Sequence, residues 1–253
     1  MSGKLMSLSN QMLSELATEQ TTRQKLPVWF LNYPSLIDAL FEVVYFIGNT
    51  EDATSPEGHF YSLGYDILVQ LPYTIRATCV LIEKGFYFEA ISLVRNLFES
   101  FIQLRYFHKH QDLIKAHITG NKVISFKTMF EEIAPGFYKE VYGKQLSMFA
   151  HSRFSSSMFR TKWSPSGIGT TTMGSKFDEA GCTYSIWKLI AILFGALNYI
   201  PILFPQYSNL VTNTTETKRR ESLAWLESAM KEHLAGKPES KEFYDLVKPL
   251  IHV

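Results

Sequence analysis

Two long apolar helical runs, separated by a single glycine, constrain the fold of this chain most. Apolar residues recur at spacings of three and four over residues 61–84 and again over residues 87–110. Gly85 stands between the two runs, at a place where helices commonly end on a glycine. Because so short a break leaves no room for a crossover, the two helices should be antiparallel neighbours. The chain is therefore predicted to be built on a long antiparallel helical hairpin.

The remainder of the chain also favours helices. Periodic apolar segments predict further helices over residues 36–47, 121–133, 136–151, 186–204, 216–234 and 239–251. The first of these is predicted to open at Pro34-Ser35, because proline suits the first turn of a helix. No alternation of apolar and polar residues is long enough to build a sheet. We predict an all-α helical bundle that forms one domain over residues 1–253, with residues 1–24 as a short helix or a loose N-terminal arm.

One segment, residues 152–183, departs from this helical pattern. It is rich in Ser, Thr and Gly, and an insertion of this length without periodicity is typical of functional or disordered segments. It carries four basic side chains before its first acid, Asp178: Arg153, Arg160, Lys162 and Lys176. Such a segment suits a phosphate backbone. We expect either a basic loop that borders a functional cleft or a plain surface insertion.

Composition limits the classes of partner and cofactor. Charged residues make up 19% of the chain, below the usual quarter, so part of the surface is expected to be covered by a partner. The net charge of +1 provides no global attraction for nucleic acid, so RNA binding requires a local patch. No zinc-binding, EF-hand or Walker spacing is present, and therefore neither a metal site nor a cofactor is expected.

The cysteines and the longest apolar segment indicate where in the cell the protein is located. Cys79 and Cys182 do not make a disulfide framework, which favours packing roles in a reducing cytoplasm. The apolar segment 186–204 contains Lys188, Asn198 and Pro201, and its uninterrupted part is shorter than a bilayer requires. We therefore expect a cytoplasmic protein in which this segment is a core helix, with no stable membrane insertion.

The second long helix places two charges on an apolar face. At 100° per residue, Glu99 lies about 40° from Arg95, on the side that also carries Ile91 and Ile102. The spacing of four residues allows Arg95 and Glu99 to form an ion pair. A charge pair on an apolar face is unfavourable unless other groups satisfy it. Two interpretations follow: a structural ion pair that fixes helix register, or a polar site inside the bundle.

A second polar stripe precedes the basic segment. Lys144, Ser147 and His151 follow one another at spacings of three and four, and therefore share one face of an α-helix. Histidine is the side chain most easily tuned to act as acid or base near neutral pH. His151 is interpreted either as a catalytic residue beside Arg95 and Glu99, or as a capping histidine.

A third cluster closes the second long helix. Arg105 is followed at short spacing by His110, and cations at a helix C-terminus interact favourably with the helix dipole. An arginine followed by a histidine is also similar to a motif of metal-independent ribonucleases, in which the arginine binds phosphate and the histidine assists attack by the ribose 2′-hydroxyl. Arg105 and His110 are therefore a second candidate site.

Residues 81–107 resemble a family of uncharacterised bacterial helical proteins. The resemblance lies in a glycine turn followed by Glu-Ala, Leu-x-Arg and Phe-Glu, carried here by Gly85, Glu89, Ala90, Leu93, Arg95, Phe98 and Glu99. A later tyrosine-serine-histidine element is similar to Tyr142, Ser147 and His151. That family in turn resembles the HEPN superfamily of helical domains, which includes dimeric ribonuclease toxins and abortive-infection proteins. The small polar residue that usually follows the HEPN arginine is replaced here by Tyr106.

The resemblance implies a stress or phage-defence effector, acting on RNA as a metal-independent endoribonuclease. The implied catalytic residues are Arg95, Glu99 and His151, and the expected phosphate contacts are Lys144, Ser147, Arg153, Arg160 and Lys162. The expected partners are a second copy of the chain, RNA, and a protein such as an antitoxin. The alternative function is a non-catalytic helical module that binds a nucleotide, RNA or protein.

Overall fold

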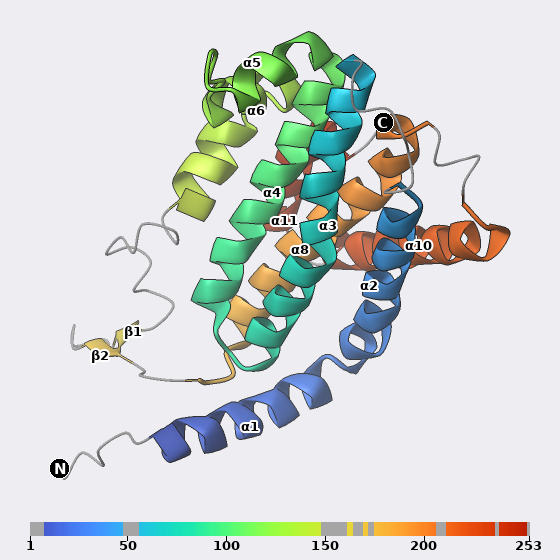
Figure 1. Ribbon diagram of the computed structural model, residues 1–253. Coiled ribbons are helices and arrows are strands. Elements are labelled where there is room, and N and C mark those ends of the chain that lie inside the picture. Colours follow the sequence, from blue (N-terminus) through green and yellow to red (C-terminus); the bar gives the residue numbers. More distant parts are fainter. Residues whose placement is uncertain are drawn as a thin grey trace.

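The computed structural model confirms the all-α prediction (Figure 1). It describes residues 8–47, 56–147, 161–163, 169–171, 175–205, 211–235 and 238–251. The longer helices are α1 (Leu8–Lys25), α2 (Pro27–Ile47), α3 (Pro56–Glu83), α4 (Tyr87–Lys109), α8 (Glu179–Leu203), α10 (Asn213–Ala235) and α11 (Pro238–Ile251). The shorter ones are η1 (Gln111–Leu113), α5 (Ile114–Ile118), α6 (Phe126–Ile133) and η2 (Tyr138–Leu146), and the strands are β1 (Thr161–Trp163) and β2 (Gly169–Thr171).

The predicted hairpin of α3 and α4 stands at the centre of the bundle (Figure 1). The turn between the helices has the hydrogen bonds of a Schellman motif, since Phe86 N–H donates to the Leu81 carbonyl at 2.8 Å and Gly85 N–H to that of Ile82 at 3.1 Å. Gly85 adopts a φ of 78°, which favours glycine. The turn therefore forms as the glycine between the two apolar runs predicted.

The other long helices surround this hairpin. Helix α2 packs on α3, α8 packs on α4, and α10 and α11 pack on α8, while α5 and α6 lie at one end of the bundle and α1 crosses the other (Figure 1). One apolar core joins these elements apart from α1, and it includes fully buried aromatic rings such as Phe98, Phe101 and Phe107. Two helices, α2 and α8, are long and apolar enough to cross a membrane by length and composition alone.

The N-terminal part of the chain is helical, and it differs from the prediction at one point. Residues 8–25 form helix α1, one of the two predicted alternatives, because polar contacts to segments distant in sequence hold this helix. Helix α2 begins at Pro27, which suits a first turn, and continues through Pro34 instead of opening there. The side-chain amide of Asn32 donates to the Val28 carbonyl at 2.7 Å within this first part of α2.

The segment 152–183 also departs from the predicted loop. Strands β1 and β2 pair antiparallel, with Lys162 opposite Thr170. Residues 179–183 already belong to α8, because the Asp178 side chain caps this helix by accepting a hydrogen bond from Gly181 N–H at 2.7 Å. The predicted boundary is therefore wrong at its C-terminal end, because α8 begins directly after its capping residue Asp178.

Candidate functional site

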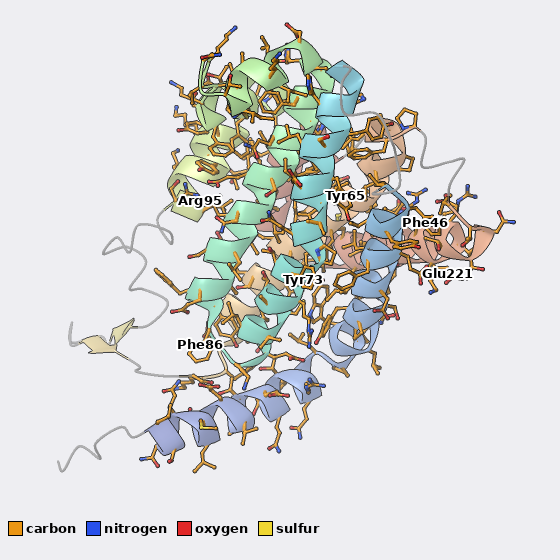
Figure 2. The ribbon with its side chains drawn as sticks, viewed as in Figure 1. Phe46, Tyr65, Tyr73, Phe86, Arg95 and Glu221 are labelled. Carbon is orange, nitrogen blue, oxygen red and sulfur yellow. The ribbon has the colours of Figure 1, made fainter. Side chains whose placement is uncertain are left out.

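Arg95 and Glu99 form the predicted ion pair on α4, at the side of the bundle that η2 covers (Figure 2). Arg95 Nε donates to Glu99 Oε1 at 2.8 Å. The pair is partly buried: the side chain of Arg95 is 17% exposed and that of Glu99 is 19% exposed. The neighbouring Ile91 and Ile102 are buried, as the helical periodicity of α4 predicted. The two charges therefore lie where the apolar core meets the surface.

Tyr142 of η2 completes a three-residue cluster with this pair. Its hydroxyl accepts hydrogen bonds from Arg95 Nη2 at 2.6 Å and from Nε at 3.2 Å, and donates one to Glu99 Oε1. The Arg95 guanidinium carbon also lies 4.8 Å from the centre of the Tyr142 ring, a favourable cation–π distance. We call Arg95, Glu99 and Tyr142 the polar triad.

The local structure of η2 sets the position of Tyr142. Residues 138–146 form a π-helix, a rare conformation that is frequent at functional sites. The Tyr142 ring stacks on that of Tyr138 with centroids 5.3 Å apart, and lies 4.8 Å from Phe130 of α6. These aromatic contacts fix the ring against α4, so that its hydroxyl reaches the ion pair.

Burial and hydrogen bonding set the protonation of the triad. Burial, followed by the hydrogen bond and the charge of Glu99, raises the pKa of Tyr142 to about 12, so the phenol stays protonated at neutral pH. Burial alone lowers the pKa of Arg95, but its contacts with Tyr142 and Glu99 outweigh that effect, and the net direction is upward. Arg95 therefore remains a cation, and Tyr142 remains a hydrogen-bond donor to Glu99.

The triad leaves two groups available for a ligand. Among the described residues, Arg95 Nη1 and Glu99 Oε2 have no hydrogen-bond partner, since the contacts within the triad use Nε, Nη2 and Oε1. A guanidinium N–H can bind a phosphate oxygen, and a carboxylate oxygen can accept a proton from a neighbouring hydroxyl.

Lys144 and Ser147, the two described members of the predicted stripe, do not share one face. Lys144 is exposed and pairs with Glu140 at 2.5 Å, whereas Ser147 is buried. The reason is the π-helix, whose wider turn changes which residues share a face. His151, Arg153 and Arg160 lie outside the described residues, and Lys162 is described only as a member of β1.

The structure does not bring Arg105 and His110 together. Arg105 Nη1 donates to the carbonyls of Pro249 and Leu250 at 2.7 Å. It thereby supplies hydrogen bonds to carbonyl groups at the C-terminal end of α11, which have no partner within the helix. His110 Nε2 lies 2.8 Å from Glu132 Oε1 on α6. The two side chains thus make contacts with different helices.

Sequence reasoning missed a buried lysine on the far side of η2. The Lys188 side chain is 1% exposed, and its Nζ donates to Gln145 Oε1 at 2.9 Å while lying 3.7 Å from the centre of the Phe243 ring. Tyr184 donates to the same amide oxygen at 3.1 Å. No described carboxylate pairs with Lys188, and burial lowers the pKa of its amine well below the ordinary value. A lone lysine within the apolar segment 186–204 was the available signal.

Replacing Lys188 with methionine should stabilise the fold in a pH-dependent way. Between the lowered pKa of Lys188 and about 10.4, the unfolded chain holds a proton that the folded chain lacks. The free energy of unfolding of the native protein therefore rises with pH in this window, by up to about 1.4 kcal/mol per pH unit. Urea unfolding of both proteins should show an advantage of Lys188→Met at pH 7 that shrinks towards pH 10. An advantage independent of pH would contradict this account.

The two cysteines are buried, and the structure records both as free thiols. Burial is the main cause that raises the pKa of the Cys182 thiol, to about 12, and it raises that of Cys79 as well. Both thiols therefore stay protonated at neutral pH, consistent with packing roles.

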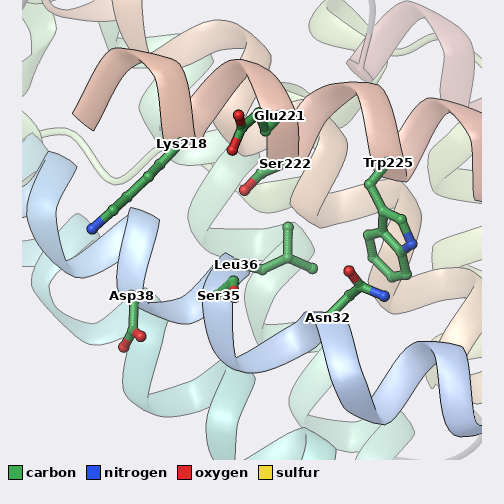
Figure 3. Close-up of a pocket in the computed structure, with 8 residues that line it drawn as sticks. All are labelled: Asn32, Ser35, Leu36, Asp38, Lys218, Glu221, Ser222 and Trp225. Carbon is green, nitrogen blue, oxygen red and sulfur yellow. The ribbon is translucent and has the colours of Figure 1, made fainter. Parts of the chain in front are cut away.

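A groove between α2 and α10 is separate from the polar triad (Figure 3). Its volume is about 290 Å³. It is lined by Asn32, Ser35, Leu36, Asp38, Lys218, Glu221, Ser222 and Trp225. In the part of the chain that the structure describes, no three His, Cys, Asp or Glu side chains gather in a way that could hold a metal ion.

Comparison with known proteins connects α4 to an uncharacterised family. Residues 68–131 match the model of a family of unknown function, DUF5677. The matched quarter of the chain includes the α3–α4 turn, Arg95 and Glu99, and it ends before Tyr142. No curated protein and no solved structure matches the chain. The resemblance to an uncharacterised family is thus supported.

Proposed function

We propose that this protein is a HEPN-like stress or phage-defence effector that binds and cleaves RNA at the polar triad. The observation that carries the proposal is a partly exposed Arg95–Glu99 pair, with side chains 17% and 19% exposed, in which the contacts among the described residues use only Nε and Nη2 of Arg95 and Oε1 of Glu99. A phosphodiester that reaches the triad would find a fixed cation and a fixed proton acceptor together. The resemblance of residues 81–107 to HEPN-related helical proteins motivates the choice of RNA as substrate.

The proposed chemistry is transfer of the RNA phosphate to the neighbouring 2′-oxygen. Arg95 Nη1 binds a non-bridging phosphate oxygen and stabilises the charge that develops there. Glu99 accepts the proton of the 2′-hydroxyl while the ribose 2′-oxygen forms a bond to phosphorus. The bond from phosphorus to the 5′-oxygen breaks, and His151 supplies the proton to that leaving group. The products are a 2′,3′-cyclic phosphate and a 5′-hydroxyl.

In this proposal Tyr142 is a positioning residue. Its hydroxyl donates to Glu99 and accepts from Arg95, and so it keeps the carboxylate and the guanidinium in one orientation. The basic side chains that follow η2 in sequence, Arg153, Arg160 and Lys162, would extend the contact along the RNA backbone.

One observation favours the alternative of a non-catalytic binding module. The three members of the triad satisfy one another through four hydrogen bonds, as a structural cluster would. In that case the cluster fixes η2 on α4, and the protein acts through a surface that binds a nucleotide, RNA or another protein.

Binding of a fluorescently labelled single-stranded RNA distinguishes the two functions. The dissociation constant should rise steeply with salt, since phosphate contacts release counterions. Arg95→Ala should weaken binding by at least about tenfold, as expected for loss of a charge-assisted hydrogen bond. Joint replacement of Arg153, Arg160 and Lys162 by alanine should also weaken it, whereas His151→Ala should abolish cleavage and leave binding largely intact.

Arg220→Ala is the matched control for the binding experiment. It removes an arginine from another Arg–Glu pair at spacing four, that with Glu216 on α10, where the two groups lie 2.7 Å apart. Its RNA affinity should equal that of the native protein. A native protein without measurable RNA affinity at low salt would refute the RNA proposal and leave the protein-binding module.

A further inference from the structure

The groove between α2 and α10 carries two carboxylates that have no counter-charge (Figure 3). Asp38 lies on the α2 wall and Glu221 on the α10 wall. Both residues are exposed, and among the described residues neither forms an ion pair or a hydrogen bond. The cationic residue of the lining, Lys218, is paired with Glu42, which also accepts a hydrogen bond from Thr215. The groove therefore has a net negative charge that no described side chain balances.

The inner wall of the groove adds hydrogen-bond acceptors that are not in use. Ser222 is 8% exposed, its hydroxyl points into the groove, and it has no hydrogen-bond partner among the described residues (Figure 3). Asn32 uses its amide N–H on the Val28 carbonyl, which leaves its Oδ1 available. Because buried polar groups are ordinarily hydrogen-bonded, the Ser222 hydroxyl favours a ligand that can bond to it.

One end of the groove is formed by a fixed aromatic ring. The Trp225 ring packs on that of Trp29 with centroids 5.7 Å apart. Trp29 is buried and stacks in turn on Tyr33, with centroids 6.1 Å apart. The indole of Trp225 is therefore held against the core, and beside it the buried Leu36 adds an apolar surface. An indole face attracts cations, and both surfaces suit the apolar part of a ligand.

We propose that this groove binds a small organic ammonium ion. Its charged end lies near Asp38 and Glu221, and its apolar part lies against Trp225 and Leu36. An ammonium group has three donors and no acceptor, so it matches a site whose carboxylates, amide oxygen and hydroxyl can all accept. The groove volume of about 290 Å³ is at the lower end of the range for small-molecule sites. The groove is separate from the polar triad, so this proposal does not rest on RNA cleavage.

Calorimetric titration with three probes of similar shape tests the ligand class. Benzylamine is a cation at pH 7, benzyl alcohol is neutral and benzoate is an anion. The native protein should bind benzylamine most tightly and benzoate least tightly. Asp38→Asn combined with Glu221→Gln should raise the dissociation constant for benzylamine about tenfold, as expected for two exposed ion pairs. The same double variant should leave the affinity for benzyl alcohol unchanged.

Glu232→Gln is the matched control for the titration. Glu232 is also an exposed carboxylate of α10 without an ion pair among the described residues, but it does not line the groove. Its replacement should leave the affinity for benzylamine unchanged. Equal affinities for the three probes, or an equal loss in Glu232→Gln and the double variant, would overturn the proposal. Absence of saturable benzylamine binding up to about 10 mM would also overturn it.

Discussion

Replacing Gly85 with alanine is expected to lower the free energy of unfolding by about 2–5 kcal/mol. Two effects add at this position. A φ of 78° costs a residue with a Cβ roughly 1–2 kcal/mol. The new Cβ would also lie 2.7 Å from the Lys176 carbonyl oxygen and 2.9 Å from Thr18 Cγ2. Forcing these groups apart adds about 1–3 kcal/mol, as overpacking does.

Gly120 provides the matched control for this prediction. Its φ of 77° nearly equals that of Gly85, but a Cβ there meets no atom within 4 Å. Chemical denaturation of Gly120→Ala should therefore report the backbone strain alone. Equal losses in both variants would show that the contact of the α3–α4 turn with Lys176 and α1 contributes nothing.

Glu99→Gln is expected to reduce RNA cleavage by about 10²–10⁴-fold, the usual contribution of a general base. The amide keeps an oxygen that can accept from Arg95 and Tyr142, so the free energy of unfolding should change by only about 1 kcal/mol. Initial cleavage rates and urea unfolding curves should be measured on the same preparations. A loss of activity that merely follows a loss of stability would assign Glu99 a structural role.

Glu216→Gln is the corresponding control. Glu216 is also an arginine-paired carboxylate, with a side chain that is 21% exposed, and it lies on α10. Its replacement should leave the cleavage rate unchanged. A similar loss in this variant would mean that the effect of Glu99→Gln is not specific to the polar triad.

The central hairpin was predictable because its signals are local. The two apolar runs, Gly85 and the spacing of Arg95 and Glu99 all lie within one stretch of sequence, and periodicity of an α-helix governs their placement. The same reasoning could not orient α1. That helix is held by Ser175, Lys84 and Glu83, which are distant in sequence, and its apolar residues face outward.

The candidate site was predictable only in part. The helical wheel paired Arg95 with Glu99, but the contact with Tyr142 depends on tertiary packing between α4 and η2. The π-helix of η2 has no periodicity that an α-helical pattern would detect, and it displaced Lys144 and Ser147 from their expected face. The roles of His151 and the basic residues that follow it remain predictions.

Analysis of RNA product ends tests the central proposal most directly. The native protein should be incubated with a single-stranded RNA in excess EDTA, and the fragments examined by mass spectrometry. The account predicts 2′,3′-cyclic phosphate and 5′-hydroxyl ends, formed by the native protein and by Glu216→Gln but not by Glu99→Gln. Intact RNA after incubation with the native protein, or equal cleavage by Glu99→Gln, would contradict it.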